Sequence, residues 1–214
     1  MVRILLLGAS GLVGRETLRL ALDRREVDGV IAPTRKPLPS HGKLTNPVAA
    51  ELESLLSDRA RWSVDAVICA LGTTMAKAGS RENFYHVDHD LPLAFARAAH
   101  QQGAGAFALV SAIGATPSSR FFYPRTKGKT EEDIRNLGFP SLTILRPIII
   151  DGERGEFRRG ESIVLQLSKA LAPILPRGFR ANPASTIARV LIDAVVDPKP
   201  GTQVVLSQEL TART

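Results

Sequence analysis

The stretch VRILLLGASGLVGRETLRLAL (residues 2–22) decides the fold of this chain. Its aliphatic run from Val2 to Leu7 predicts a buried strand, and the glycines Gly8, Gly11 and Gly14 follow at once. A pattern with helical periodicity begins directly after this turn. Strand, glycine-rich turn and helix in this order are typical of the first unit of a dinucleotide-binding fold.

The missing side chain has a different use at each of the three glycines. Gly8 permits the tight turn, Gly11 lets the backbone approach a pyrophosphate, and Gly14 lets the helix pack closely on the strand. The pyrophosphate would then lie at a helix N-terminus, where N–H groups and the helix dipole favour negative charge. The alternative is a turn without a ligand. The other residues that we expect at this part of the cofactor site are Ser10, Leu12 and Val13.

Short aliphatic runs alternate with helical patterns along most of the chain, which predicts an α/β fold with a doubly wound parallel sheet of the Rossmann type. Continuous hydrophobicity fits strands that are covered on both faces. We expect one domain over residues 1–214, in which residues 151–214 form a lid and C-terminal helices with a strand. The expected strands are Val2 to Leu7, Gly29 to Ala32, Ala66 to Leu71, Phe107 to Ser111 and Leu142 to Leu145, a weaker one near Leu44, and a late one at Gln203 to Leu206.

The end of the second strand indicates which dinucleotide binds. An acidic residue at this position accepts a hydrogen bond from the adenosine ribose of NAD. Here the strand runs instead into Thr34, Arg35 and Lys36, and two cations suit the 2′-phosphate of NADP. We therefore expect these three residues to bind the cofactor, and NADP(H) rather than NAD(H). The alternative is a solvated loop with ordinary surface charges.

Composition and charge exclude several classes of protein. The net charge is +7, but the basic residues are dispersed and aromatic residues make up 5% of the chain, which argues against a nucleic-acid-binding surface. No apolar run is long enough to cross a membrane. The single cysteine, Cys69, cannot form an intramolecular disulfide, and no signal peptide is recognisable, so we expect a cytoplasmic protein.

Three residues suggest a reaction. Ser111 ends an expected strand, and Tyr123 and Lys127 are four positions apart, so on a helix they share one face. A free phenol has a pKa of about 10, and an adjacent cation favours the phenolate. Tyr123 would then exchange a proton with a carbonyl or alcohol while a nicotinamide exchanges hydride. Pro124 disfavours helical geometry at Tyr123, although proline is tolerated in a first helical turn.

Taken together, six motifs resemble an atypical short-chain dehydrogenase/reductase, and within that superfamily the Tat-interacting-protein-like branch. They are GASGLVG (8–14), ALGTTMAKAG (70–79), FYHVDHD (84–90), LVSAIGA (109–115), YPRTKGKTE (123–131) and LRPIIIDGERGEFR (145–158). The resemblance implies NADP(H) binding, with Leu71, Gly72, Thr73 and Lys127 at the cofactor and Pro147 near the nicotinamide. It implies that Ser111, Tyr123 and Lys127 form the catalytic set.

Two readings of function remain open. The first is an NADP(H)-dependent oxidoreductase acting on a small carbonyl or alcohol. The second is a non-catalytic, NADP(H)-responsive regulatory protein with a protein partner, as the resemblance to this branch implies. We expect no metal site at His86, Asp88, His89 and Asp90: Asp90 precedes an apolar helical pattern, so these polar residues are interpreted as helix caps and as a loop near the cofactor. Arg154 and Arg158 are either loop residues or a clamp for an acidic substrate.

Overall fold

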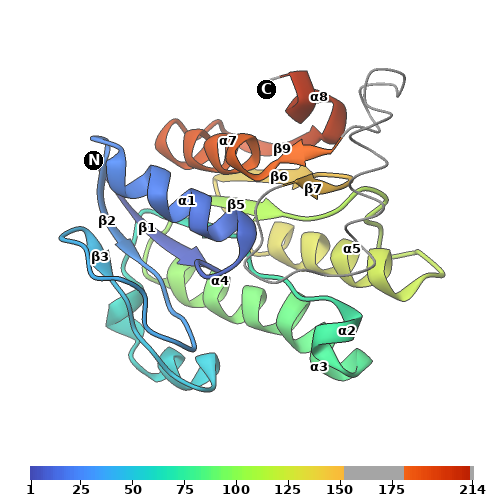
Figure 1. The fold of residues 1–214 in the computed structure, drawn as a ribbon, viewed down its shortest axis with the longest axis horizontal. Coiled ribbons are helices and arrows are strands. Elements are labelled where there is room, and N and C mark those ends of the chain that lie inside the picture. The colour runs from blue at the N-terminus through green and yellow to red at the C-terminus, as the bar shows by residue number, and fades with distance from the viewer. Residues whose placement is uncertain (152–180, 213–214) are drawn as a thin grey trace.

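The structure is a computed structural model that describes residues 1–151 and 181–212 (Figure 1). Within those residues, one seven-stranded parallel sheet has the strand order β3-β2-β1-β4-β5-β6-β9. A second, two-stranded sheet pairs β7 with β8. The strands are β1 (Val2–Leu7), β2 (Val27–Ile31), β3 (Leu44–Thr45), β4 (Ala66–Cys69), β5 (Ala106–Val110), β6 (Ser141–Arg146), β7 (Ile150–Asp151), β8 (Asn182–Pro183) and β9 (Gly201–Leu206).

Helices cover both faces of the large sheet, which confirms the doubly wound architecture (Figure 1). α1 and α7 lie side by side on one face, and α4 and α5 lie on the other. The helical segments are α1 (Leu12–Asp23), η1 (Leu52–Ser57), η2 (Arg59–Trp62), α2 (Met75–Ala78), α3 (Arg81–Tyr85), η3 (His86–Asp90), α4 (Leu91–Gln101), α5 (Phe122–Arg135), α7 (Ala184–Val196) and α8 (Ser207–Ala212).

The two faces of β1 explain its continuous hydrophobic run. Ile4 and Leu6 are buried in the core beneath α1 and α7, and Leu5 and Leu7 are buried in the core that includes Phe95 of α4. Because side chains alternate across a strand, a strand that is covered on both sides needs an apolar residue at every position. The expected strands are all present, with ends that differ by two residues at most.

The interpretation of Asp90 as a helix cap is wrong. α3 continues through the π-helical segment η3 directly into α4, so Asp90 lies inside a helical region and its side chain caps nothing. Its carboxylate contacts the Nδ1 atom of His89 at 2.7 Å instead. Widened turns of this kind are often found at functional sites. Here the widened turn carries Asp88, which is 1% exposed.

The backbone of the first turn of α1 lies in direct contact with the backbone of the turn after β1. A Cβ atom added to Gly14 would lie 2.0 Å from the carbonyl oxygen of Gly8. Gly8 itself has a φ of 85°, and a Cβ atom there would lie 2.6 Å from the carbonyl oxygen of Ala70. The first turn of α1 can therefore lie this close to the carboxyl end of β1 only because Gly8 and Gly14 have no side chains.

Replacing Gly14 by alanine tests this packing. Helix propensity alone predicts that Gly14→Ala stabilises the protein by about 1 kcal/mol. We expect the opposite, a loss of about 1–3 kcal/mol in the free energy of unfolding, because the backbone must move to admit the new methyl group. Urea denaturation measures the difference. Gly42→Ala is the matched control, because a Cβ atom at Gly42 meets nothing within 4 Å, and an unchanged or raised stability of Gly14→Ala would contradict the packing argument.

Candidate functional site

A cleft of about 1290 Å³ lies at the carboxyl ends of the parallel strands. The loops that follow β1, β2, β4, β5 and β6 all contribute to its walls. Ligands of open α/β sheets bind at this edge, where the strand order reverses. The sheet reverses between β1 and β4, so the cleft lies at the expected place.

Most of the residues that the sequence suggested line this cleft. They are Ser10, Gly11, Leu12, Val13, Arg35, Lys36, Leu71, Gly72, Thr73, Ser111, Tyr123, Lys127 and Pro147. Gly8, Gly14 and Thr34 lie outside its lining. The first two shape the turn behind it, as described above. Arg154, Arg158 and most of the expected lid fall outside the described residues.

The N-terminus of α1 is suited to an anion. The N–H groups of a first helical turn have no partner within the helix, and here the N-cap position is Gly11, which has no side chain to cap them. The first turn also contains no acidic residue. Because Ser10, Gly11 and Leu12 face the cleft, a diphosphate can contact these amides. The donor set and the space therefore fit a dinucleotide.

The turn after β2 presents two cations. Thr34 is 4% exposed, donates to the carbonyl oxygen of Lys36 at 2.7 Å, and accepts from Asn46 Nδ2 at 2.8 Å. These bonds shape the turn from below, while Arg35 and Lys36 are exposed and line the cleft. Thr34 therefore does not line the cleft itself; its hydrogen bonds hold the turn that carries Arg35 and Lys36.

A buried ion pair lies at the centre of the cleft. Lys127 Nζ is 2.6 Å from Asp88 Oδ1, and the backbone N–H of Thr73 donates to Asp88 Oδ2 at 2.7 Å. Burial lowers the pKa of Lys127, but the raising effects of its neighbours, with Asp88 first among them, together outweigh it, so the pKa lies above its ordinary value. Lys127 therefore stays protonated although its side chain is buried. Asp88 joins η3, α5 and the loop after β4.

The side chain of Ser111 forms a hydrogen bond with a second buried charged residue, Glu131. Its hydroxyl donates to Glu131 Oε1 at 2.5 Å, and Glu131 has no exposed surface. Arg146 of β6 binds the same carboxylate with two nitrogen atoms, at 2.9 and 2.6 Å. The hydrogen bonds that Arg146 donates to Glu131 raise the pKa of Arg146. The structure thus gives Ser111 a buried partner that the sequence did not suggest.

The helix α5 carries Tyr123, Lys127 and Glu131 at intervals of four residues, so these side chains share one face. Pro124 falls in the first turn, which leaves the helical spacing of Tyr123 and Lys127 intact. Tyr123 is 43% exposed and its ring packs against Phe84 at 5.7 Å. The phenol is thus open to the cleft, and the two charged groups behind it are buried.

Sequence reasoning missed Glu131, Arg146 and the role of Asp88. Glu131 follows Lys127 by four residues and so lies on the same helical face, and this spacing could have identified it as a residue near the site. Nothing local marks Arg146 as its partner, since the two meet only when α5 packs against β6. The isoleucines Ile148, Ile149 and Ile150 also line the cleft.

Other reactive groups have structural partners. Burial raises the pKa of the Cys69 thiol to about 11, which disfavours a thiolate nucleophile. His89 lies between Asp90 and Asp133, with its Nε2 atom 2.8 Å from the latter. No group of three or more potential metal ligands occurs in residues 1–151 and 181–212. In the same residues, no helix has the length and hydropathy of a membrane span.

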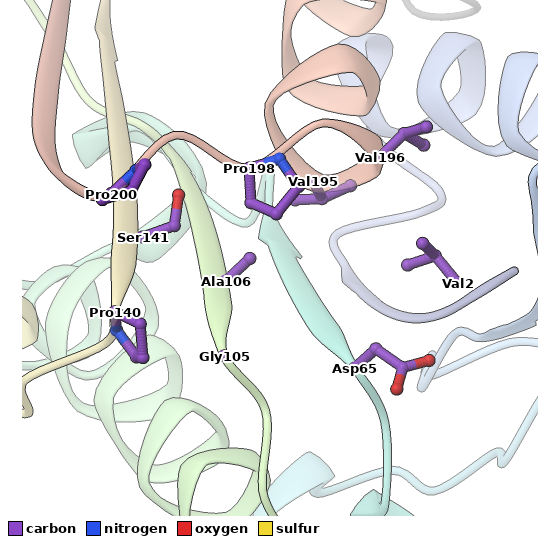
Figure 2. Close-up of a pocket in the computed structure, with 10 residues that line it drawn as sticks. All are labelled: Val2, Asp65, Gly105, Ala106, Pro140, Ser141, Val195, Val196, Pro198 and Pro200. Carbon is purple, nitrogen blue, oxygen red and sulfur yellow. The ribbon is translucent and has the colours of Figure 1, made fainter.

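A second, smaller hollow of about 340 Å³ lies at the opposite, amino ends of the strands (Figure 2). Val2, Gly105 and Pro140 lie at the starts of β1, β5 and β6, and Val195 of α7 closes one side. Among the described residues that line this hollow, the one titratable side chain is Asp65, which accepts from the backbone N–H of Arg3 at 2.7 Å. Reactive side chains therefore gather in the larger cleft.

Comparison with known proteins agrees with this geometry. The model of a protein family described as NAD(P)H-binding matches residues 8–198. The protein named "Protein fmp52, mitochondrial" from Aspergillus clavatus is 35% identical over 207 residues, which cover 91% of this chain and 87% of that protein. Its namesake from Candida albicans is 35% identical over 199 residues, covering 88% and 85%.

Solved structures are similar in fold. The WbmH enzyme of Bordetella bronchiseptica in complex with NAD+ has a TM-score of 0.69 and 16% identity, over 99% of this chain and 80% of that chain. A short chain dehydrogenase family protein from Francisella tularensis has a TM-score of 0.66 and 14% identity, over 98% of both chains. At these identities the likeness shows the fold alone, and the expected Rossmann fold is confirmed.

The expected cytoplasmic location is contradicted. The fungal relatives that cover most of the chain are named mitochondrial proteins. The expectation rested in part on Cys69, which is a single buried thiol. One cysteine cannot form an intramolecular disulfide in any compartment, so it carried no information on location.

The buried ion pair makes a test of stability possible. Asp88→Asn leaves the Lys127 ammonium buried without a counter-charge, and we expect a loss of about 3–5 kcal/mol in the free energy of unfolding at neutral pH. The double variant Asp88→Leu with Lys127→Met should recover most of it, because an apolar pair replaces both charges. Since the folded-state pKa of Lys127 is raised, the contribution of the Lys127 charge to stability is present at neutral pH and is lost as the pH rises through that value.

Urea denaturation measures both variants against a surface control. Glu16 and Arg19 form an exposed pair at 3.2 Å, so Glu16→Gln should cost less than about 1 kcal/mol. An equal, small effect of Asp88→Asn and Glu16→Gln would show that the buried pair contributes nothing.

Proposed function

This chain belongs to the NAD(P)H-binding family, and from that premise we propose that it is an NADP(H)-dependent oxidoreductase of the atypical short-chain dehydrogenase/reductase type. Its substrate is proposed to be a small carbonyl or alcohol. The observation that carries the proposal is the position of Tyr123, Lys127 and Ser111 in the cleft whose other end is the N-terminus of α1. One cleft thus holds both the dinucleotide-binding turn and a proton-transferring phenol.

The proposed roles follow from position and charge. Tyr123 gives a proton to a carbonyl oxygen, or takes one from an alcohol, at its phenolic oxygen. Lys127 remains protonated and lies on the same face of α5 as the Tyr123 phenol, one helical turn away. The nicotinamide supplies or accepts the hydride when the cofactor is bound. Reduction thus adds one hydride and one proton to a carbonyl, and oxidation removes both.

The preference for NADP(H) is proposed from the electrostatics of the cleft. Arg35 and Lys36 lie in the lining after β2, and no acidic residue is found in that turn. Among the described residues that line the cleft, the one carboxylate is Asp88, and Lys127 pairs with it. A 2′-phosphate would therefore meet positive charge and no opposing acid.

A second candidate function is a non-catalytic, NADP(H)-responsive regulatory protein, as the likeness of its motifs to the Tat-interacting-protein-like branch suggests. One observation favours it. Asp88 lies 2.6 Å from Lys127 and neutralises part of its charge. An ammonium that is already paired stabilises a phenolate less than a free one does. Turnover distinguishes the two candidates.

Nucleotide preference tests the role of the cations. NADPH at about 100 times its Kd should stabilise the protein by about 2.7 kcal/mol in a thermal-shift experiment. We expect Arg35→Ala with Lys36→Ala to weaken NADPH binding about ten-fold or more and leave NADH binding unchanged, because hydrogen bonds to charged groups contribute about 1.5–3 kcal/mol. Arg97→Ala removes an exposed charge on α4 and should change neither affinity. Equal NADPH affinities in the wild type and the double variant would refute the preference.

Turnover tests the role of Tyr123. We expect Tyr123→Phe to reduce carbonyl-dependent NADPH oxidation by about 100-fold or more while NADPH binding is preserved, because the proton donor is lost. Tyr85→Phe is the control, since Tyr85 stacks on His89 and does not line the cleft. Absence of oxidation by the wild type with a broad carbonyl and alcohol panel, together with partner capture that depends on NADPH, would instead support the regulatory candidate.

A further inference from the structure

The carboxylate of Glu131 is surrounded by hydrogen-bond donors. Its Oε1 atom receives Arg146 Nε at 2.9 Å and Ser111 Oγ at 2.5 Å. Its Oε2 atom receives Arg146 Nη2 at 2.6 Å and Arg135 Nη2 at 3.0 Å. A guanidinium group has no acceptor. Both oxygen atoms of Glu131 are therefore acceptors, and neither has room for a proton of its own.

The direction of the Ser111 hydroxyl follows from this arrangement. A serine hydroxyl has one hydrogen and two lone pairs. Because Glu131 Oε1 has no hydrogen to give, the hydrogen between the two atoms belongs to Ser111. Ser111 lines the cleft and is 5% exposed. What its Oγ atom can offer to a ligand in the cleft is a lone pair.

We infer that Glu131 is a positioning residue that makes Ser111 a hydrogen-bond acceptor toward the cleft, so that the site selects an apolar alcohol over the matching ketone or aldehyde. The inference rests on the proposed oxidoreductase function and specifies its substrate class. An alcohol has a hydrogen to donate to Ser111. A carbonyl oxygen has none, and its lone pairs would face those of Ser111.

The hydrogen bonds then run in one direction. In the binding complex the alcohol donates its hydrogen to Ser111, and Ser111 donates to Glu131; for oxidation that hydrogen turns to the Tyr123 phenolic oxygen, which takes the proton. Hydrogen bonds that share one direction polarise and strengthen one another. The two arginines at Glu131 hold the end of this chain in place, so the direction is set before the ligand arrives.

We infer that the alcohol is apolar because aliphatic side chains line the cleft near Ser111. Ile113, Ile148 and Ile149 line the same cleft as Ser111, next to Pro147. Ile113 is 50% exposed in this structure. An aliphatic or aromatic substituent on the alcohol would cover such surface, which favours binding by removing apolar area from water.

Binding measurements in a variant that cannot turn over test the inference. Tyr123→Phe loaded with NADP+ is titrated calorimetrically with 1-phenylethanol and with acetophenone, so both ligands meet the same cofactor state. We expect the alcohol to bind about five-fold more tightly, the ratio that one neutral hydrogen bond produces. Adding Ser111→Ala should bring the ratio to about one. Adding Ser118→Ala, an exposed serine that bonds Thr116, should leave it unchanged.

A second variant tests the part played by Glu131. Glu131→Leu with Arg146→Met replaces the buried ion pair by apolar groups, a change that proteins often tolerate. It frees the hydrogen of Ser111 to turn into the cleft, so acetophenone should now bind at least as tightly as 1-phenylethanol. A merely structural role of Glu131 would weaken both ligands and leave their ratio unchanged. Circular dichroism and NADP+ binding report whether this variant folds, and the Ser111→Ala experiment does not depend on it.

The binding results distinguish failure of this inference from failure of the proposed function. Tighter binding of acetophenone that is lost in Ser111→Ala would show that Ser111 donates, and would overturn the inference while the proposed function stands. Bound NADP+ with no binding of either probe would contradict the apolar substrate class. Failure to bind NADP+ at all would remove the proposed function itself, and the inference with it.

Discussion

The close contact between α1 and the turn after β1 is the constraint on which the rest of the structure depends. A Cβ atom at Gly14 would lie 2.0 Å from the carbonyl oxygen of Gly8, so the helix reaches this position only without a side chain there. The contact directs the uncapped first turn of α1 into the cleft at the carboxyl ends of the strands. The anion-binding turn and Tyr123 then line one cleft, because both lie at the same edge of a parallel sheet.

The cleft depends equally on two buried charged groups of α5. Lys127 pairs with Asp88, and Glu131 pairs with Arg146. Burying an ion pair is costly, and an apolar pair of similar volume is often as stable. These pairs are therefore better explained by what they orient than by stability: one keeps an ammonium beside the phenol of Tyr123, and the other sets the direction of the Ser111 hydroxyl. Together they connect α5 to η3, β5 and β6.

The sequence predicted the fold well where local pattern and tertiary burial agree. The β1 strand matches its expected bounds, Val2 to Leu7, because an unbroken aliphatic run can be buried only between two layers. The sequence-based assignment of a helix start at Asp90 was wrong, because the apolar helical pattern of α4 begins inside a longer helical region. A cap and an interior position of a π-helical turn look alike in sequence, since the difference lies in the backbone hydrogen bonds before that residue.

By itself, the sequence determined the class of the fold, the glycine turn that admits a diphosphate, and the helical face shared by Tyr123 and Lys127. These features depend on residues close together in the chain, whose geometry backbone periodicity sets. Only the tertiary structure decided which groups act on those residues. Asp88 and Lys127 are 39 positions apart (127 − 88), and Ser111 meets Glu131 and Arg146 only through the packing of α5 on two strands. Charge pairing and hydroxyl direction depend on distances in space, which residue spacing along the chain does not encode.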